Sequence, residues 1–241
     1  MKLLFLLACV VGAALASDVT KAGGKYCTCY SEQNGAGYFY TFTEYCQDLY
    51  TYDFDNAIDS STVTGLWMFY ENVDFNAYAA GRVYWAHGID FSLNFPFDYV
   101  DMTSSLRFAG SPTCLNCDTF TLYDGFDFNG AEYYGVSDTY DLGPLDAKAS
   151  SIVLTGYSAW TFYEGYSFTG YSVCLFPDTF HTDGPDGLTL DLGMFPDVTQ
   201  VSLYDNAVRS VRIGCYTENI VKAVPIKAEF KSDKGAWGYL N

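Results

Sequence analysis

The chain has few basic residues. Of its 241 residues only 12 are Lys or Arg, against 29 that are Asp or Glu, which gives a formal charge of -17 at pH 7. Proteins that bind nucleic acid need basic side chains to neutralise phosphates, so this composition excludes a nucleic-acid partner. The excess of carboxylates fits a solvated acidic surface or the attraction of cations such as Ca²⁺.

The chain also has little of what catalysis requires. It contains only two histidines, His87 and His181, and neither stands at a spacing typical of a metal site. The sequence shows no Gly-x-Ser-x-Gly elbow, phosphate-binding loop or His-Glu-x-x-His motif. Both histidines are therefore interpreted as structural residues at strand edges or in loops. We predict a protein that is not an enzyme and that requires no cofactor.

Long apolar runs are absent after the first 16 residues. Met1 and Lys2 precede an almost unbroken apolar stretch over residues 3–14, and Ala14-Leu15-Ala16 supplies a small-residue cleavage pattern. This pattern predicts a secretory signal peptide over residues 1–16; an uncleaved anchor is the alternative. No later run approaches the roughly 18 apolar residues of a membrane-spanning helix. We therefore expect a secreted, extracellular protein without a membrane span.

Cysteines are few outside that segment, which contains Cys9. Seven remain: Cys27, Cys29, Cys46, Cys114, Cys117, Cys174 and Cys215. In an oxidising compartment they are expected to pair as disulfides, and the odd number leaves one thiol free or available for a covalent dimer. A four-thiolate zinc site formed by the two closely spaced pairs, 27 with 29 and 114 with 117, is the alternative.

Aromatic residues and glycine are abundant. The chain has 22 Tyr, 19 Phe and 22 Gly, a composition that favours strands and tight turns. No segment after the signal peptide keeps a helical apolar period. An all-β fold is predicted.

The aromatic residues recur in a repeat. Four segments, here called the aromatic boxes, begin with Tyr and end with Gly or Ala; they are residues 30–37, 70–77, 123–130 and 163–170. Each is followed by a segment, here called a Ser cluster, and by a closing Gly; the clusters are residues 55–60, 100–105, 146–151 and 205–210. Such periodicity indicates duplicated units. The Gly of a box can adopt a positive φ, its Tyr and Phe can stack, and the cluster's Ser can bind the folded hairpin.

The pattern Tyr-x4-Phe-x-Gly, followed by Asp/Asn-x4-Ser and a closing Gly, resembles the βγ-crystallin Greek key. The resemblance, to a secreted invertebrate-type member of that family, covers residues 26–215 and implies two Greek-key β-sandwich domains in tandem. The expected domains are residues 25–111 (motifs 26–65 and 66–110) and 118–215 (motifs 119–156 and 157–214). Residues 216–241 form a tail for which we expect partial order at best.

The chain departs from the family pattern at three places. Gly35 replaces the Phe of the first box, which removes a stack, and Ala77 replaces the Gly of the second, which puts its positive-φ turn in doubt. The fourth motif is longer than the others, and residues 176–198 are interpreted as an enlarged surface loop. A neutral insertion or a chain-specific interaction would explain that loop.

In calcium-binding members of the family, an Asp/Asn-Asp/Asn-x-x-Ser/Thr-Ser cluster supplies ligands together with hairpin carbonyls of the partner motif. The residues here that match this pattern are Asp55, Asn56, Asp59, Ser60, Asp101, Ser104, Asp146 and Ser150. Val100 and Ala147 interrupt the second and third clusters. Arg209 stands at the fifth position of the fourth cluster, where its charge should exclude a cation. We expect weak binding, first at cluster one, then at three and two; otherwise these residues only cap turns.

The leading functional hypothesis is a structural or matrix protein for which Ca²⁺ is an optional stabiliser. The alternative is a recognition or defence module that binds a carbohydrate, a microbial surface or a protein partner through its aromatic surface. A third hypothesis is a protease inhibitor that uses a protruding, disulfide-held loop.

Overall fold

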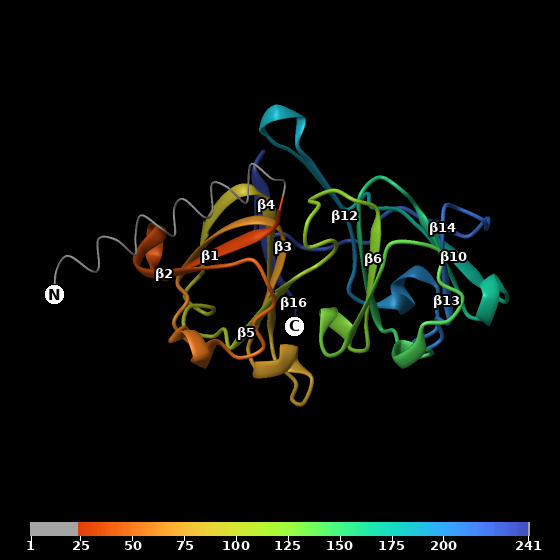
Figure 1. Ribbon diagram of the computed structural model, residues 1–241, viewed down its shortest axis with the longest axis horizontal. Helices are drawn as coiled ribbons and strands as arrows, with labels where there is room; N and C mark the ends of the chain where they lie inside the picture. Colours follow the sequence, from red (N-terminus) through yellow and green to blue (C-terminus); the bar gives the residue numbers. More distant parts are fainter. Residues whose placement is uncertain (1–23, 241) are drawn as a thin grey trace.

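The computed structural model describes residues 24–240, so the predicted signal peptide lies outside the described residues. The chain forms two β-sheet domains that lie side by side along the long axis of the molecule (Figure 1). The helical segments of the described residues are 3-10 helices of three or four residues. None of these segments is long and apolar enough to cross a membrane. The all-β prediction is confirmed.

The first domain is built on two long strands. Its strands are β1 (Tyr26–Glu32), β2 (Ala36–Phe42), β3 (Ser60–Tyr70), β4 (Val83–Asn94) and β5 (Ser105–Phe108). They are antiparallel, in the order β4-β3-β1-β2, and β5 also pairs with β3. The register of β3 shifts between Val63 and Gly65, so its first half pairs with β1 and its second half with β5. One strand thus serves both layers around a core that contains Cys27, Trp67 and Leu106.

The second domain has two separate sheets. Its strands are β6 (Thr119–Tyr123), β7 (Glu132–Gly135), β8 (Ser151–Thr155), β9 (Trp160–Tyr163), β10 (Ser172–Leu175), β11 (Phe180–Asp183), β12 (Thr189–Phe195) and β13 (Ser210–Ile213). One sheet has the order β11-β12-β8-β6-β7, and the other has the order β13-β9-β10-β14, where β14 is Ile220–Val221. Phe120 and Leu154 of the first sheet pack with Trp160 of the second in a common core.

Short 3-10 helices connect the strands. They are η1 (Gln33–Gly35), η2 (Leu49–Tyr52), η3 (Val73–Asn76), η4 (Phe126–Phe128), η5 (Gly143–Leu145), η6 (Tyr166–Phe168), η7 (Pro185–Gly187) and η8 (Val198–Val201). Four of them, η1, η3, η4 and η6, lie within the aromatic boxes. The hairpin of each box therefore turns at a 3-10 segment in the same position.

The predicted aromatic stacks form in three of the four boxes. The Tyr and Phe ring centroids are 5.6 Å apart in the second box and 5.7 Å apart in the third and fourth. In the first box, Gly35 leaves room above Tyr30, and the ring of Phe39 on the neighbouring β2 lies 5.8 Å from it. The expected loss at Gly35 is thus offset by a cross-strand aromatic contact.

The turn at the end of the second box differs from the other three. Gly37, Gly130 and Gly170 have φ near +80°, whereas Ala77 has φ of -63°. The left-handed conformation moves one residue back, to Asn76 (φ +60°), because Asn adopts it at lower cost than Ala. The Asn76 side chain accepts a hydrogen bond from the Asn72 amide at 2.9 Å and stabilises the altered turn.

The interpretation of residues 176–198 as a surface loop is wrong. The segment contains β11 and β12, an antiparallel hairpin, and β12 pairs along β8. Phe180 and Leu192 of this hairpin are buried in a cluster with Trp85 of the first domain. The inward-facing alternation was hidden because Pro, Gly and Asp residues interrupt it. The long fourth motif therefore supplies part of the interface between the domains.

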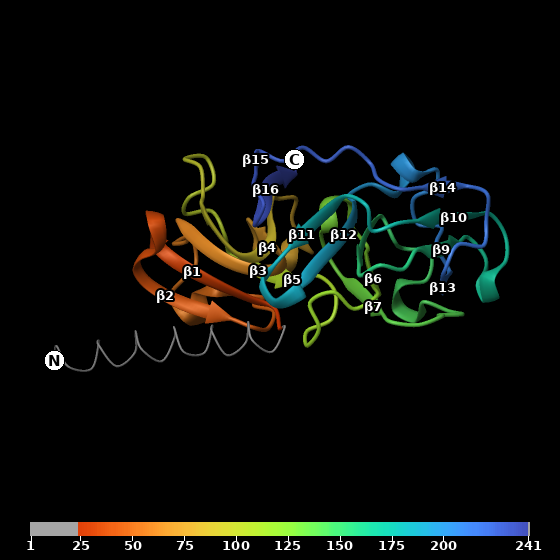
Figure 2. The ribbon, with the colours of Figure 1, turned by 90° about the horizontal axis from the view of Figure 1, so that it is seen from above.

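The tail is ordered, contrary to expectation. After β14, on the second domain, the chain returns to the first domain (Figure 2). There β15 (Phe230–Lys231) and β16 (Gly235–Leu240) form a hairpin, and β16 pairs with β4 over six residues. Ala236 is fully buried. The sequence signal was weak because β16 has only six residues and contains two glycines.

His87 leads to a pH-dependent prediction. It lies on β4, is 2 % exposed, and packs against Trp85 and Phe180. Burial, and secondarily the charge of Lys231, lower its pKa to about 3. Between that pH and about 6.5, the ordinary His value, the unfolded chain binds the proton more readily, so the free energy of unfolding falls as the pH falls, by up to about 1.4 kcal/mol per pH unit.

We expect the variant His87→Met to lose this part of the acid sensitivity. Urea unfolding of both proteins at pH 7 and pH 4.5 measures the difference. Other titrating groups act equally in both proteins, so the difference between the two slopes isolates His87. Equal slopes would contradict the assignment of a neutral, buried imidazole.

Candidate calcium sites

One Ser in each cluster pins a box hairpin, as the sequence predicts. The hydroxyls of Ser60, Ser105, Ser151 and Ser210 each donate to a hairpin carbonyl at 2.6 Å and accept from a hairpin amide at 3.0 Å. These contacts satisfy backbone groups that have no ladder partner. Ser60 is a predicted calcium ligand, but its hydroxyl already donates to the carbonyl of Glu32 and accepts from the amide of Gly35.

The Ser clusters face one another in pairs. The amide of Asn56 in the first cluster donates to the carbonyl of Thr103 in the second at 3.0 Å. In the second domain, the backbone amide of Ala147 donates to the carbonyl of Val208, and the backbone amide of Asn206 donates to the carbonyl of Ala149. This register places the first residue of one cluster beside the fifth residue of its partner. The ligand sets are therefore formed across two clusters, not within one.

The most complete oxygen set joins the third cluster to the fourth. The buried Ser150 hydroxyl lies 2.6 Å from Asp205 Oδ1 and 3.2 Å from the carbonyl oxygen of Asp124 in the box hairpin. Hydroxyl, carboxylate and carbonyl oxygens are the ligand mixture that Ca²⁺ prefers. Asp205 is missing from the ligands predicted from sequence because its own cluster contains Arg209. The signal that identifies it is the pairing of clusters.

Arg209 blocks the reciprocal set. Its Nη1 lies 2.9 Å from Asp146 Oδ2 and 2.7 Å from the Tyr166 hydroxyl, which itself donates to Asp146 at 2.6 Å. The guanidinium also lies 4.9 Å from the centroid of the Tyr166 ring. The cation that Arg209 opposes is thus one that Asp146, not Asp205, would hold. Asp146 is occupied by an ion pair, although its Oδ1 has no hydrogen-bond partner among the described residues.

In the first domain, the cluster register places Asp55 beside Ser104. Ser104 is buried, and its backbone amide donates to the carbonyl oxygen of Tyr70 at 2.8 Å. Asp55 Oδ1 is buried without a hydrogen-bond partner in residues 24–240. Asn56, at the second position, is exposed with φ of +51° and turns the chain toward the partner cluster. This pair resembles Ser150 and Asp205 in residue type.

The reciprocal set of the first domain has Asp59 at the fifth position and Val100 at the first. Burial and the charges of Asp101 and Glu32 raise the pKa of Asp59. Asp101 is exposed, has φ of +52° and contributes charge near Asp59. Without a carboxylate at position 100, this set is the poorer of the two in the domain.

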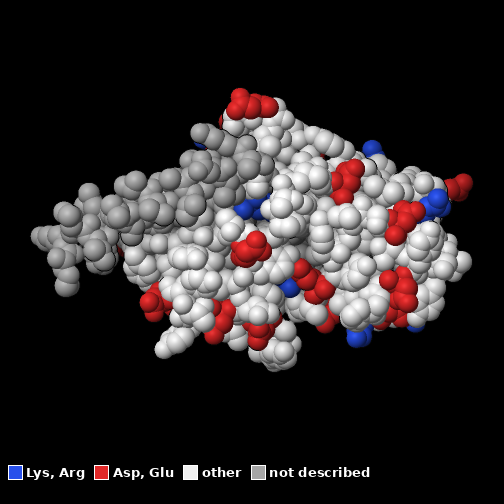
Figure 3. Space-filling model, in the orientation of Figure 1, with Lys and Arg blue, Asp and Glu red and all other residues white. Residues whose placement is uncertain are grey.

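No group of three or more His, Cys, Asp or Glu side chains that could hold a metal occurs in residues 24–240. Any cation here would depend on hydroxyl and carbonyl oxygens in addition to one or two carboxylates. On the face seen in Figure 3, groups of Asp and Glu are distributed over both domains, with few Lys and Arg between them.

Four of the seven cysteines form disulfides, Cys114 with Cys117 and Cys174 with Cys215. The first disulfide uses two of the thiolates of the alternative zinc site. The other three, Cys27, Cys29 and Cys46, are unpaired and buried in the first domain. Because these thiols are buried, none of them is presented to a second chain.

No family model matches the chain, and no curated protein matches it. Among solved structures it is similar to geodin, a βγ-crystallin from Geodia cydonium, at 19% identity and a TM-score of 0.55, covering 78% of this chain and 98% of that one. A βγ-crystallin from an archaeon matches at 24% identity and a TM-score of 0.31, covering 40% of this chain and 98% of that one. Protein S complexed with calcium matches at 15% identity and a TM-score of 0.28, covering 79% of this chain and 99% of that one. The likeness to geodin shows that the chain has the βγ-crystallin fold, as two Greek-key sandwich domains in tandem.

Proposed function

We propose that the protein is a secreted, non-enzymatic structural protein that is stabilised by weak Ca²⁺ binding in its second domain. The observation that carries the calcium assignment is the convergence of the Ser150 hydroxyl, the Asp205 carboxylate and the Asp124 carbonyl. Ser151 pins the same hairpin one residue further on, because its hydroxyl donates to the carbonyl of Gly125, the residue after Asp124. The site therefore requires little reorganisation to accept a cation. The Asp55–Ser104 pair is proposed as a second, weaker site.

A structural role is supported by how the chain uses its aromatic residues. Trp67, Trp85 and Trp160 are fully buried, and the interface between the domains is itself an apolar cluster.

We place the domains at residues 25–111 and 118–215, because the segment between them contains no strand and is closed by the Cys114–Cys117 disulfide. The two disulfides support an oxidising, extracellular location.

Calcium is expected to raise the melting temperature. A dissociation constant of roughly 10⁻⁴–10⁻³ M, typical of extracellular modules, gives about 1.4–2.7 kcal/mol of stabilisation at 10 mM Ca²⁺. The variant Asp205→Asn should lose most of this gain, because it removes a charged ligand. Asp178→Asn, an exposed substitution on the same domain, is the matched control and should keep the gain.

Thermal unfolding in 10 mM Ca²⁺, in 10 mM Mg²⁺ and in chelator measures these shifts. A melting temperature that does not change with Ca²⁺ would overturn the calcium assignment and leave the structural role unaffected. An equal gain in both variants would place the ion elsewhere.

A further inference from the structure

The returning tail completes a pocket on the first domain. The pocket has a volume of about 500 Å³ and is lined by Arg82, Pro96, Asp98, Tyr99, Glu229, Trp237 and Tyr239. Three of these residues come from the tail, which has no counterpart in the repeat of boxes and clusters. The pocket is therefore a feature of this chain and not of the duplicated unit.

Aromatic rings form one wall of the pocket. Trp237 and Tyr239 are two residues apart on β16, so they lie on the same face of the sheet. The Tyr239 ring lies 5.0 Å from that of Tyr99, and the Trp237 ring stacks on the buried Tyr84 at 5.1 Å and 21°. Trp237 and Tyr239 both remain partly exposed. They offer flat apolar area to a ligand.

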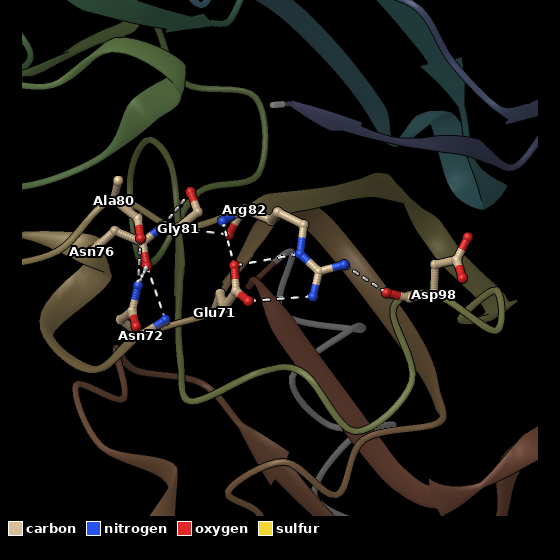
Figure 4. A network of polar contacts seen from close by, with 7 residues as sticks. All are labelled: Glu71, Asn72, Asn76, Ala80, Gly81, Arg82 and Asp98. Carbon is tan, nitrogen blue, oxygen red and sulfur yellow. Dashed lines mark hydrogen bonds and ion pairs between the residues drawn. The ribbon is translucent and has the colours of Figure 1, made fainter.

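A fixed guanidinium lies beside these rings. Arg82 Nε and Nη2 each contact the Glu71 carboxylate at 3.3 Å, and Nη1 donates to the Asp98 carbonyl at 2.8 Å (Figure 4). The guanidinium also lies 5.3 Å from the centroid of the Tyr99 ring. Three of its five N–H groups are used in this way, and the others remain to donate. Arg82 is thus an oriented donor at the edge of the aromatic wall.

A buried hydroxyl beneath the wall has no partner. Tyr84 is fully buried, and its hydroxyl makes no hydrogen bond to the described residues. Its pKa is raised by burial and by Tyr99 and Glu229, two residues of the pocket. Buried polar groups are normally satisfied. The Tyr84 hydroxyl is therefore a hydrogen-bonding group next to the pocket that the described residues leave unsatisfied.

The charges around the pocket exclude two ligand classes. Arg82 and Lys227 already lie over the rings of Tyr99 and Tyr239, so the ring faces that would attract a cationic ligand carry the protein's own cations. Glu229 is paired with Lys227 at 2.5 Å, whereas Asp98 and the net charge of the chain oppose an anionic ligand. What fits is an uncharged molecule with one apolar face and several hydroxyls.

We propose that this pocket binds a neutral pyranose, as the terminal or internal unit of a glycan. The apolar face of the sugar would lie on Trp237, with Tyr239 at its side. Its hydroxyls would donate to the Asp98 carboxylate and to Oε2 of Glu229, whose Oε1 contacts Lys227, and would accept from Arg82. A single sugar should bind with a dissociation constant on the order of 1 mM, because a small ligand makes few contacts.

The test is an array of neutral, sulfated and sialylated glycans probed with labelled protein. Hits are confirmed by following Trp fluorescence as the matching methyl glycoside is added. Tyr239→Ala should lower the affinity at least tenfold, whereas Tyr204→Ala, an exposed Tyr on the second domain, should leave it unchanged. Glu229→Gln removes a charge with little change in shape, and it should also weaken binding. This variant keeps the test informative if Tyr239→Ala lowers the melting temperature.

Binding of neutral glycans that is lost in Tyr239→Ala and weakened in Glu229→Gln supports the proposal. Binding of sulfated or sialylated glycans alone would overturn the ligand class, and full binding by both variants would overturn the location. The absence of binding to any glycan would overturn the proposal as a whole. All assays are run in chelator, so failure here is distinct from failure of the calcium site.

Discussion

Replacing Arg107 by Met is expected to cost about 3–5 kcal/mol of the free energy of unfolding, because it leaves the largely buried carboxylate of Glu132 without its positive partner. Arg107 lies on β5 and is 1 % exposed. Its guanidinium donates to the Tyr70 hydroxyl at 2.9 Å and to the carbonyls of Gly130 and Phe128 at 2.8 and 2.7 Å. Glu132 Oε2, on the second domain, lies 3.5 Å away.

These contacts connect the two domains through a single side chain. Burial raises the pKa of Glu132, and the charge of Arg107 acts in the opposite direction. The double variant Arg107→Met with Glu132→Gln should therefore recover part of the loss, because no unpaired charge remains. Arg212→Met is the matched control, since Arg212 pairs with Asp138 at the surface, where such pairs contribute about 0–1 kcal/mol.

Urea unfolding of the four proteins measures the effect. If Arg107→Met lowered the free energy of unfolding no more than Arg212→Met does, the Arg107 guanidinium would not stabilise the domain interface. If the double variant were as unstable as the single one, the loss would come from packing and not from the orphaned charge.

Truncation after Val224 is the second change with a large expected effect. It removes β16, which pairs with β4, and with it the buried Ala236 and the Trp237 ring that covers Tyr84. The loss should be at least the roughly 3–5 kcal/mol that deletion of one large aromatic from a core costs. The truncated protein also exposes β4 as a sheet edge and should aggregate more readily.

Melting temperature and light scattering of the truncated protein test this prediction. The full-length variant Trp237→Ala is the control, and it should lose less because the strand pairing remains. A truncated protein as stable as the full chain would show that the tail only rests on the domain.

The sequence allowed the duplicated architecture to be predicted because its signals are local. The Tyr, Phe, Gly and Ser positions of each box and cluster follow from the backbone of one hairpin, and the Ser contacts occur as expected. Hairpin β11–β12 and strand β16 were missed because their apolar period is short and interrupted. Their stability comes from burial against distant residues such as Trp85 and Tyr84.

The candidate site was predicted only in part for a related reason. Ser150 and Asp146 were identified within one cluster, but their partners, Asp205 and Arg209, belong to the other cluster of the domain. Sequence order groups residues by cluster, whereas the fold pairs the first position of one cluster with the fifth of its partner. Arg107 gave no sequence signal, because its role depends on carbonyls of the second domain.

Calorimetric titration with Ca²⁺ of the natural protein and of Arg209→Ser tests this crosswise pairing most directly. Removal of the guanidinium frees Asp146 and places a hydroxyl beside it, which reproduces the Ser150–Asp205 arrangement. We predict that Arg209→Ser binds one more Ca²⁺ than the natural protein, and that adding Asp146→Asn removes the gain. Equal stoichiometry in the natural protein and Arg209→Ser, or no heat from either in millimolar Ca²⁺, would contradict it.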